Sequence, residues 1–169
     1  FARFEMTLAD MKGLKRGRLK LAVVTTAKYF APRLLGPFCQ LHPGIEVSLK
    51  VSNRERVLER LARNEDDLCI LGQPPENLDV VAEPFLENPL VVIAPHHHPL
   101  AGKRNISLHS IVDDRLFQRE VGSGTRIAAE EFFQRHRVRF KNVMQLGNNE
   151  AIKWAVAGGL GIAVISQHA

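Results

Sequence analysis

Short strand-like runs alternate with longer helical runs along this chain, and this alternation restricts its fold more than any other feature. Residues 19–24 form a largely apolar run that ends in two valines, and apolar residues alternate strictly from Ile45 to Val51. Residues 28–41, which lie between these runs, carry apolar side chains at helical spacing. Strands that alternate with helices predict parallel sheets whose faces are covered by the helices.

The pattern occurs twice, which predicts an α/β fold with two small lobes and mostly parallel sheets. Lobe one is expected at 17–85 and lobe two at 86–169, with a hinge between Gln73 and Asn88. Strands are expected at 19–24, 45–51, 68–71, 89–94, 115–118, 143–146 and 161–165, and helices at 28–41, 54–64, 125–136 and 149–157. Six side chains are expected to pack inside the lobes: Cys39, Cys69, Ile127, Ala128, Phe132 and Trp154.

The composition is typical of a folded domain and not of a disordered or membrane-spanning chain. Of the 169 residues, 45% are hydrophobic and 24% are charged, and every apolar stretch is too short to cross a bilayer. The formal net charge is +5, but residues 1–20 hold six basic and two acidic residues, while the other 149 hold 17 and 16. A near-neutral body gives little support for a nucleic-acid-binding surface. Without a visible signal peptide, the protein is expected in the cytoplasm.

Residues 1–16 are expected to form the end of a helix. Phe1, Phe4, Leu8 and Met11 follow one another at spacings of three, four and three residues, as along the seam of a coiled coil. The same spacing also fits a single amphipathic helix that packs on its own domain.

The turns that follow the strands are the expected functional region. In parallel sheets, ligands collect beyond the carboxyl ends of the strands, where helix N-termini carry partial positive charge. Short polar residues stand at these turns, and Lys28, Arg54 and Arg126 follow three of them, so the turns predict a site for an anion. A structural alternative is that the polar residues cap the helices that follow. This alternative applies to Thr26, Ser52, Ser123 and Asn148, and the three cations can be ordinary surface charges.

Enzyme and metal signatures are not found in the sequence. The run Gly122–Thr125 lacks the Lys-Ser/Thr pair of a phosphate-binding loop, and Gly158–Gly161 precedes a strand instead of a helix. The adjacent residues His96–His98 point in different directions and have no acidic or cysteine partner at ligand spacing, which favours an exposed loop. We therefore expect a binding protein without catalytic residues, metal or cofactor.

Several longer segments resemble the effector-binding domain of LysR-type transcriptional regulators in residue identity, order and spacing. Within this family, the runs TAKYFAP at 26–32 and SNRER at 52–56 are most similar to regulators of the carbon-dioxide-fixation (RuBisCO) operon, the CbbR group. The resemblance covers nearly the whole chain from Gly13. It is carried by residues 13–35, 42–49, 51–61, 72–75, 98–101, 120–126 and 159–165.

The resemblance implies the effector-sensing domain of a DNA-binding transcription factor that activates carbon-fixation genes. Two periplasmic-binding-protein-like lobes would hold an anionic, phosphorylated metabolite or nucleotide between them. The full-length homodimer or homotetramer would bind promoter DNA through a helix-turn-helix that this chain lacks, and residues 1–16 would end the dimerising linker helix. With the three cations included, the expected effector contacts are Thr25, Thr26, Ala27, Lys28, Ser52, Asn53, Arg54, Gln73, Glu120, Ser123, Thr125, Arg126 and Asn148.

Two questions stay open at this point. Glu120 is unusual beside an anion, and it can either pair with a cation of its own lobe or accept a ligand hydroxyl. Two other protein classes also share the architecture, namely a solute-binding protein of a transport system and an enzyme built on two lobes. The missing signal peptide argues against the first class, and the missing nucleophile–base pair and metal ligands argue against the second.

The end of the chain generates a prediction about stability. In the family, the chain crosses back to complete the first lobe, and because this chain stops at Ala169, that return is expected to be missing. An incomplete lobe leaves apolar surface and a strand edge in water. We therefore expect residues 1–169 alone to be marginally stable or to aggregate. A cooperative unfolding transition at high temperature, followed by circular dichroism, would contradict this expectation.

Overall fold

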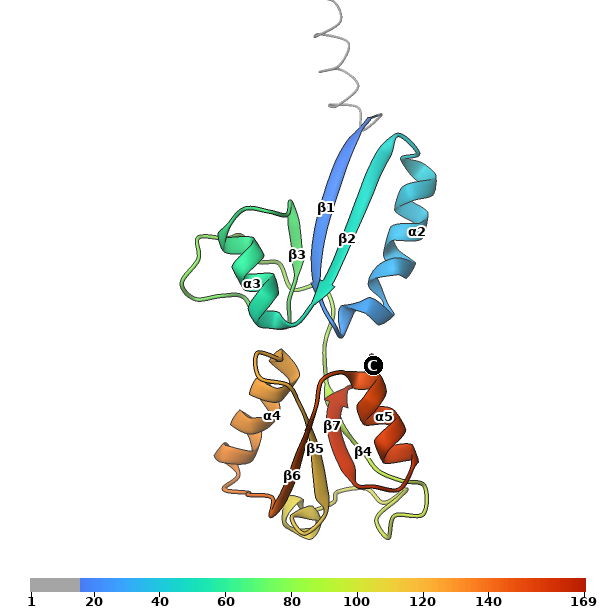
Figure 1. The fold of residues 1–169 in the computed structure, drawn as a ribbon, viewed down its shortest axis with the longest axis vertical. Helices are drawn as coiled ribbons and strands as arrows, with labels where there is room; N and C mark the ends of the chain where they lie inside the picture. The colour runs from blue at the N-terminus through green and yellow to red at the C-terminus, as the bar shows by residue number, and fades with distance from the viewer. Residues whose placement is uncertain (1–15) are drawn as a thin grey trace, which may run out of the picture. The chain divides into compact units, whose positions relative to one another are not determined.

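The structure, a computed structural model, describes residues 16–169 and divides into two units (Figure 1). One unit ends at Val81, and the other runs from Ala82 to Ala169. The expected lobe boundary and hinge stay predictions, and the expected helix at 1–16 lies outside the described residues but for Arg16. Within residues 16–169, no helix has the length and apolar character needed to cross a membrane.

The first unit is built on a three-stranded parallel sheet in the order β2-β1-β3. Strand β1 pairs with β2 along its whole length, from Gly17 opposite Ile45 to Val24 opposite Ser52. The elements are β1 (Gly17–Val24), η1 (Ala27–Tyr29), α2 (Ala31–Leu41), β2 (Ile45–Ser52), α3 (Arg54–Ala62) and β3 (Leu68–Ile70).

The core of the first unit follows from the alternation along β1. Because successive strand residues point to opposite faces, Leu21 and Val23 share one face. They pack there with Ala27 and Ala31, from the start of the helical region. Helix α3 contacts β1 and buries Val57 completely. The core of this unit thus contains side chains from β1, η1, α2 and α3.

The helix expected at 28–41 is divided into two elements. The 3-10 turn η1 ends at Tyr29, and Phe30 has a non-helical φ of −124°. Helix α2 then begins at Ala31 with Pro32 in its first turn. Since Pro32 has no N–H to donate to the carbonyl of Lys28 and its ring crowds that carbonyl, it disfavours a continuous α-helix through this point.

The second unit is built on a four-stranded sheet in the order β4-β7-β5-β6. Strands β5, β6 and β7 are parallel, and β4 runs antiparallel to β7. The expectation of mostly parallel sheets is confirmed. The elements are β4 (Leu90–Ile93), η2 (Leu108–Ile111), β5 (Arg115–Arg119), α4 (Gly124–Arg135), β6 (Asn142–Leu146), α5 (Asn149–Ala157) and β7 (Ile162–Ser166).

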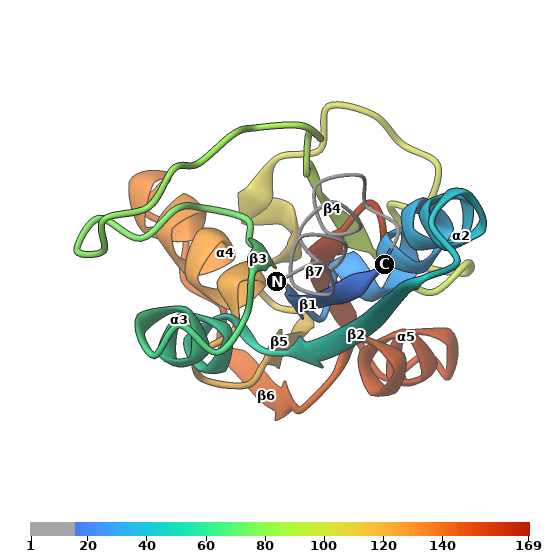
Figure 2. The same cartoon turned by 90° about the horizontal axis from the view of Figure 1, so that it is seen from above.

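Helices α4 and α5 lie on opposite faces of this sheet, so the second unit has three layers (Figure 2). Adjacent strand residues divide between the two layers of core. Leu116 and Ile162 pack on the α4 side, whereas Phe117 and Ala163 pack on the α5 side. Burial on both faces is the reason that β7 is a continuous apolar run from Ile162 to Ile165 and that β5 has two adjacent apolar residues, Leu116 and Phe117.

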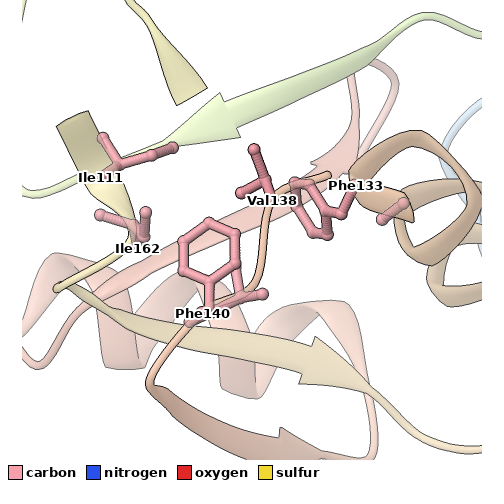
Figure 3. Packing of buried hydrophobic residues seen from close by; sticks show 7 residues of the cluster. Ile111, Phe133, Val138, Phe140 and Ile162 are labelled. Atoms are coloured by element: carbon pink, nitrogen blue, oxygen red, sulfur yellow. The ribbon is translucent and has the colours of Figure 1, made fainter. Parts of the chain in front are cut away.

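The core on the α4 side is closed by residues far apart in the sequence (Figure 3). Ile111 comes from η2, and Val138 and Phe140 come from the segment between α4 and β6. The rings of Phe133 and Phe140 have centroids 5.0 Å apart and meet at 61°, an edge-to-face contact. This contact holds α4 in one rotational setting on the sheet.

The expectation that Ile127 and Phe132 face the core is wrong. Both side chains are exposed, and Phe133 is buried instead. Apolar residues surround much of α4, so the helical period alone left its inward face undecided. The contact with Phe140 selects Phe133, and Phe132 stacks on His136 with ring centroids 4.3 Å apart.

Two further expectations about buried side chains are wrong. Cys39 is exposed, and Trp154 is 77% exposed. Trp154 lies midway between Ile152 and Val156 in the sequence, so it points to the opposite side of α5 from these core residues. Cys69 is half-buried, as is Ala128. Burial raises the pKa of the Cys69 thiol above its ordinary value, which keeps this thiol protonated.

The approach of Gly161 to β5 generates a stability prediction. A Cβ atom at Gly161 would collide with the backbone carbonyl oxygen of Arg115. Gly161→Ala should therefore separate the start of β7 from β5 and lower the free energy of unfolding by more than ~2 kcal/mol. Gly36→Ala is the matched control, because Gly36 lies in α2 with open space around it. The control should stabilise the protein by up to ~1 kcal/mol in denaturant unfolding. Equal midpoints for both variants would contradict the prediction.

Candidate functional site

The three expected turns of the first unit lie at one edge of its sheet. Strands β1, β2 and β3 are parallel, with Val24 opposite Ser52 and Val23 opposite Ile70, so their carboxyl ends coincide. The turns at 25–28, 53–54 and 71–73 follow these ends. Nη2 of Arg54 donates to the carbonyl oxygen of Gln73 at 3.4 Å, which links two of the turns directly.

Thr26 is a buried hydroxyl residue at this edge. It is only 7% exposed and holds the N-cap position of η1, but its side chain makes no capping hydrogen bond. Its neighbour Ala27 is buried in the core, and Thr25 is half-buried. The capping alternative therefore does not explain why a hydroxyl stands at position 26.

Asn53 and Lys28, two other polar residues at this edge, have structural partners. Asn53 caps α3, since its Oδ1 accepts from the backbone N–H of Arg56 at 3.0 Å. Ser52 is the last residue of β2 and is not the cap. The Lys28 ammonium lies 4.8 Å from the centroid of the Tyr29 ring. The alternative that Ser52 caps the helix after β2 is thus wrong, because Asn53 is the cap.

A second group of expected residues lies at the carboxyl edge of the second unit. Arg119, the last residue of β5, is opposite Leu146, the last residue of β6, so the turns after these strands are neighbours. The turn after β5 has Gly122 at a φ of +82°, a left-handed conformation that favours glycine. The backbone N–H of Ser123 donates to the carbonyl of Glu120 at 3.2 Å and closes this turn.

Ser123 in the second unit resembles Thr26 in the first, because both are buried hydroxyl residues at the N-cap position of a helix. It is 3% exposed and stands at the N-cap position of α4, where its side chain makes no capping hydrogen bond. Thr125, in the first turn of the same helix, is also buried. These hydroxyls lie at the positive end of a twelve-residue helix, where an anionic oxygen is stabilised.

The open question about Glu120 is answered by its neighbour Arg119. The Arg119 side chain is 1% exposed, and it donates to both oxygens of the Glu120 carboxylate, from Nε at 2.8 Å and from Nη2 at 2.9 Å. Glu120 therefore pairs with a cation of its own unit. The paired charges cancel locally, so Glu120 does not make this edge repel anions.

Arg126 is held against the body of the second unit. Its Nε donates to Glu130 at 2.8 Å, and its Nη1 donates to Oε1 of Gln145 at 2.8 Å and to the carbonyl of Arg119 at 3.3 Å. These bonds join the first turn of α4 to β5 and β6. Arg126 thus orients the start of α4, and part of its charge is neutralised by Glu130.

The start of α5 contains one expected residue and one that sequence reasoning missed. Asn148 caps the helix, with its Oδ1 accepting from the N–H of Ala151 at 2.8 Å. The next residue, Asn149, is 2% exposed, and its Oδ1 accepts from Nη1 of Arg119. Arg119 and Asn149 were not predicted, because neither the arginine at the end of a strand nor the second of two asparagines carries a sequence signal for burial.

Within residues 16–169, no three His, Cys, Asp or Glu side chains come together, the histidine run included. His96 and His97 are exposed, as expected for a loop, but His98 is partly buried. Nε2 of His98 lies 3.3 Å from Oδ2 of Asp114, and Nδ1 accepts from the N–H of Leu100 at 3.2 Å. His98 therefore stabilises the loop between β4 and η2.

Comparison with protein families gives one match over almost the whole chain. The family model described as "LysR substrate binding domain" matches residues 12–169. The HTH-type transcriptional activator CmpR of Synechocystis sp. is 54% identical over 164 residues, which are 97% of this chain and 54% of that protein. A RuBisCO operon transcriptional regulator of Acidithiobacillus ferrooxidans is 54% identical over 163 residues, 96% of this chain and 53% of that protein. The chain spans about half the length of these relatives.

A solved structure is similar in both sequence and fold. The regulatory domain of CcmR from Synechocystis PCC6803, in complex with 2-PG, is 58% identical and superposes with a TM-score of 0.87. The match covers 90% of this chain and 74% of that one. The expected fold class, α/β lobes of the periplasmic-binding-protein type, is confirmed.

The ion pair between the buried Arg119 and the partly buried Glu120 generates the next prediction. Glu120→Ala leaves the buried guanidinium without its carboxylate, and breaking such a pair should lower the free energy of unfolding by about 3 kcal/mol. Glu46→Ala breaks the pair with Arg18, in which both side chains are mostly exposed, and should cost less than about 1 kcal/mol. Urea unfolding followed by fluorescence measures both. Similar decreases in the free energy of unfolding of the two variants would show that the pair of Arg119 and Glu120 stabilises the protein no more than the exposed pair does.

Proposed function

The chain belongs to the family of LysR substrate-binding domains, and we propose that it senses an anionic, phosphorylated metabolite for a transcription factor that activates carbon-fixation genes. The full-length regulator would act in the cytoplasm as a homo-oligomer that binds promoter DNA through a separate helix-turn-helix. The chain itself would bind a ligand and catalyse no reaction.

One observation carries the proposal. Each unit has a buried hydroxyl residue at the carboxyl edge of its sheet, Thr26 in one and Ser123 in the other, and neither side chain caps its helix. The hydroxyl of a mostly buried residue that makes no capping bond at the helix start is suited to a ligand oxygen. The cation Arg54 at the first edge favours a negatively charged ligand, and Glu120 at the second edge does not oppose one because it is paired with Arg119.

Similarity supports the class of ligand. The CcmR regulatory domain, 58% identical, is in complex with 2-PG, and the resemblance to RuBisCO-operon regulators implies a phosphorylated effector. We propose 2-PG, or a metabolite of the same chemistry, as the ligand of this chain. The expected contacts named from the sequence, and the placement of the ligand between the two lobes, remain part of the proposal.

Regulation would follow from a difference in affinity between two states of the regulator. A ligand shifts a conformational equilibrium only as far as it prefers one state over the other. A tenfold preference corresponds to roughly 1.4 kcal/mol, so a few charge-assisted hydrogen bonds present in one state are enough. The change of conformation would alter how the oligomer binds promoter DNA.

Two hydroxyl deletions test the proposal. Thr26→Val and Ser123→Ala each remove one donor to an anionic oxygen, so each should weaken 2-PG binding about tenfold or more in titration calorimetry. Ser48→Ala is the control, because Ser48 is exposed in the middle of β2, and its affinity should match that of the unchanged protein. Wild-type affinity in both Thr26→Val and Ser123→Ala would overturn the proposed site.

A further inference from the structure

Asn149 has a polar group that the fold buries and leaves unsatisfied. Among the described residues, its Nδ2 is the one buried side-chain nitrogen or oxygen without a hydrogen-bond partner. The residue is 2% exposed and is the first residue of α5. Buried amides in native proteins are nearly always hydrogen-bonded, to protein groups or to water, so an unsatisfied N–H donor is suited to a ligand oxygen.

The hydrogen-bonding groups of Arg119 decide the orientation of the Asn149 side-chain amide. The guanidinium of Arg119 has only donors and no acceptor. Nη1 of Arg119 contacts the Asn149 amide, so the amide must present its oxygen to Arg119 and its NH2 group to the other side. A flipped amide would bring N–H groups of both residues together. The unsatisfied NH2 is therefore a consequence of the buried arginine.

Arg119 is itself fixed in place. Both oxygens of Glu120 accept from it, and Glu120 belongs to the turn that leads into Ser123 and α4. One guanidinium thus connects the turn before α4 to the first residue of α5. The NH2 group of Asn149 is held in a set orientation at the carboxyl edge that also holds Ser123.

We propose that Nδ2 of Asn149 donates a hydrogen bond to an anionic oxygen of the effector, and that Arg119 is the positioning residue that aims it. This inference rests on the proposed function and adds a contact that sequence reasoning did not name. The positive end of α5 and the N–H donor both favour an oxygen that carries negative charge. Asn149 would therefore favour an anionic ligand over a neutral polar one, because the hydrogen bond to a charged oxygen is stronger.

Two substitutions at position 149 separate the loss of the N–H donor from the addition of a negative charge. Asn149→Asp keeps an acceptor oxygen for Arg119 but replaces the donor with a carboxylate that repels an anion. Asn149→Ala removes the donor without adding charge. Titration calorimetry with 2-PG, in the full-length regulator, should show affinity at least tenfold weaker for Asn149→Ala and weaker still for Asn149→Asp. Asn142→Asp makes the same change of charge at the exposed start of β6 and should bind 2-PG like the unchanged protein.

The outcomes separate this inference from the proposed function. If the unchanged regulator binds 2-PG and Asn149→Ala binds it equally well, the Asn149 contact is overturned while the proposed function stands. The same holds if only Asn149→Asp loses affinity, since that result reports charge alone. If the unchanged regulator binds neither 2-PG nor other phosphorylated metabolites, the proposed function fails, and the inference fails with it.

Nuclear magnetic resonance gives a second test that does not depend on the variants folding. The side-chain NH2 signals of Asn149, observed by selective asparagine labelling of the unchanged regulator, should shift when 2-PG is added. Their hydrogen exchange should also slow, because the bound oxygen occupies the donor. Signals and exchange rates that stay the same at saturating 2-PG would overturn the proposal.

Discussion

Parallel pairing of strands is the constraint on which the site depends. In each unit, β-strands that run in the same direction end at the same edge, so turns far apart in the sequence become neighbours. The helices that follow these turns begin at that edge, and their positive ends face the same region. The turns lie together at this edge because each one follows the carboxyl end of a parallel strand. Their position does not depend on which side chains they carry.

The buried guanidinium of Arg119 gives the second unit its particular chemistry. A charge removed from water must be paired and hydrogen-bonded, and Glu120 and Asn149 supply those partners. The pairing neutralises the carboxylate that would otherwise oppose an anion. It also fixes the direction of an amide. One buried arginine therefore connects the stability of this edge with the orientation of the Asn149 amide.

Much of the fold could be predicted from the sequence, and less of the site. The strict alternation from Ile45 to Val51 predicted β2, and the resemblance to LysR-type regulators pointed to the family. The inward face of α4 could not be predicted, since Phe132 and Phe133 have similar hydrophobicity and the choice depends on Phe140. The cap of α3 was misplaced by one residue, from Asn53 to Ser52, because both are good caps and only the end of β2 decides between them.

The sequence by itself determined the order of strands and helices and the turns at which polar residues stand. These properties are local, because hydrophobic period and turn residues act over a few positions. Only the tertiary structure decided that Arg119 is buried, that Glu120 is its partner and that the amide of Asn149 keeps an unsatisfied NH2. The physical reason is distance along the chain: Arg119 and Asn149 are 30 residues apart, and their contact exists only after β5 and β6 have paired.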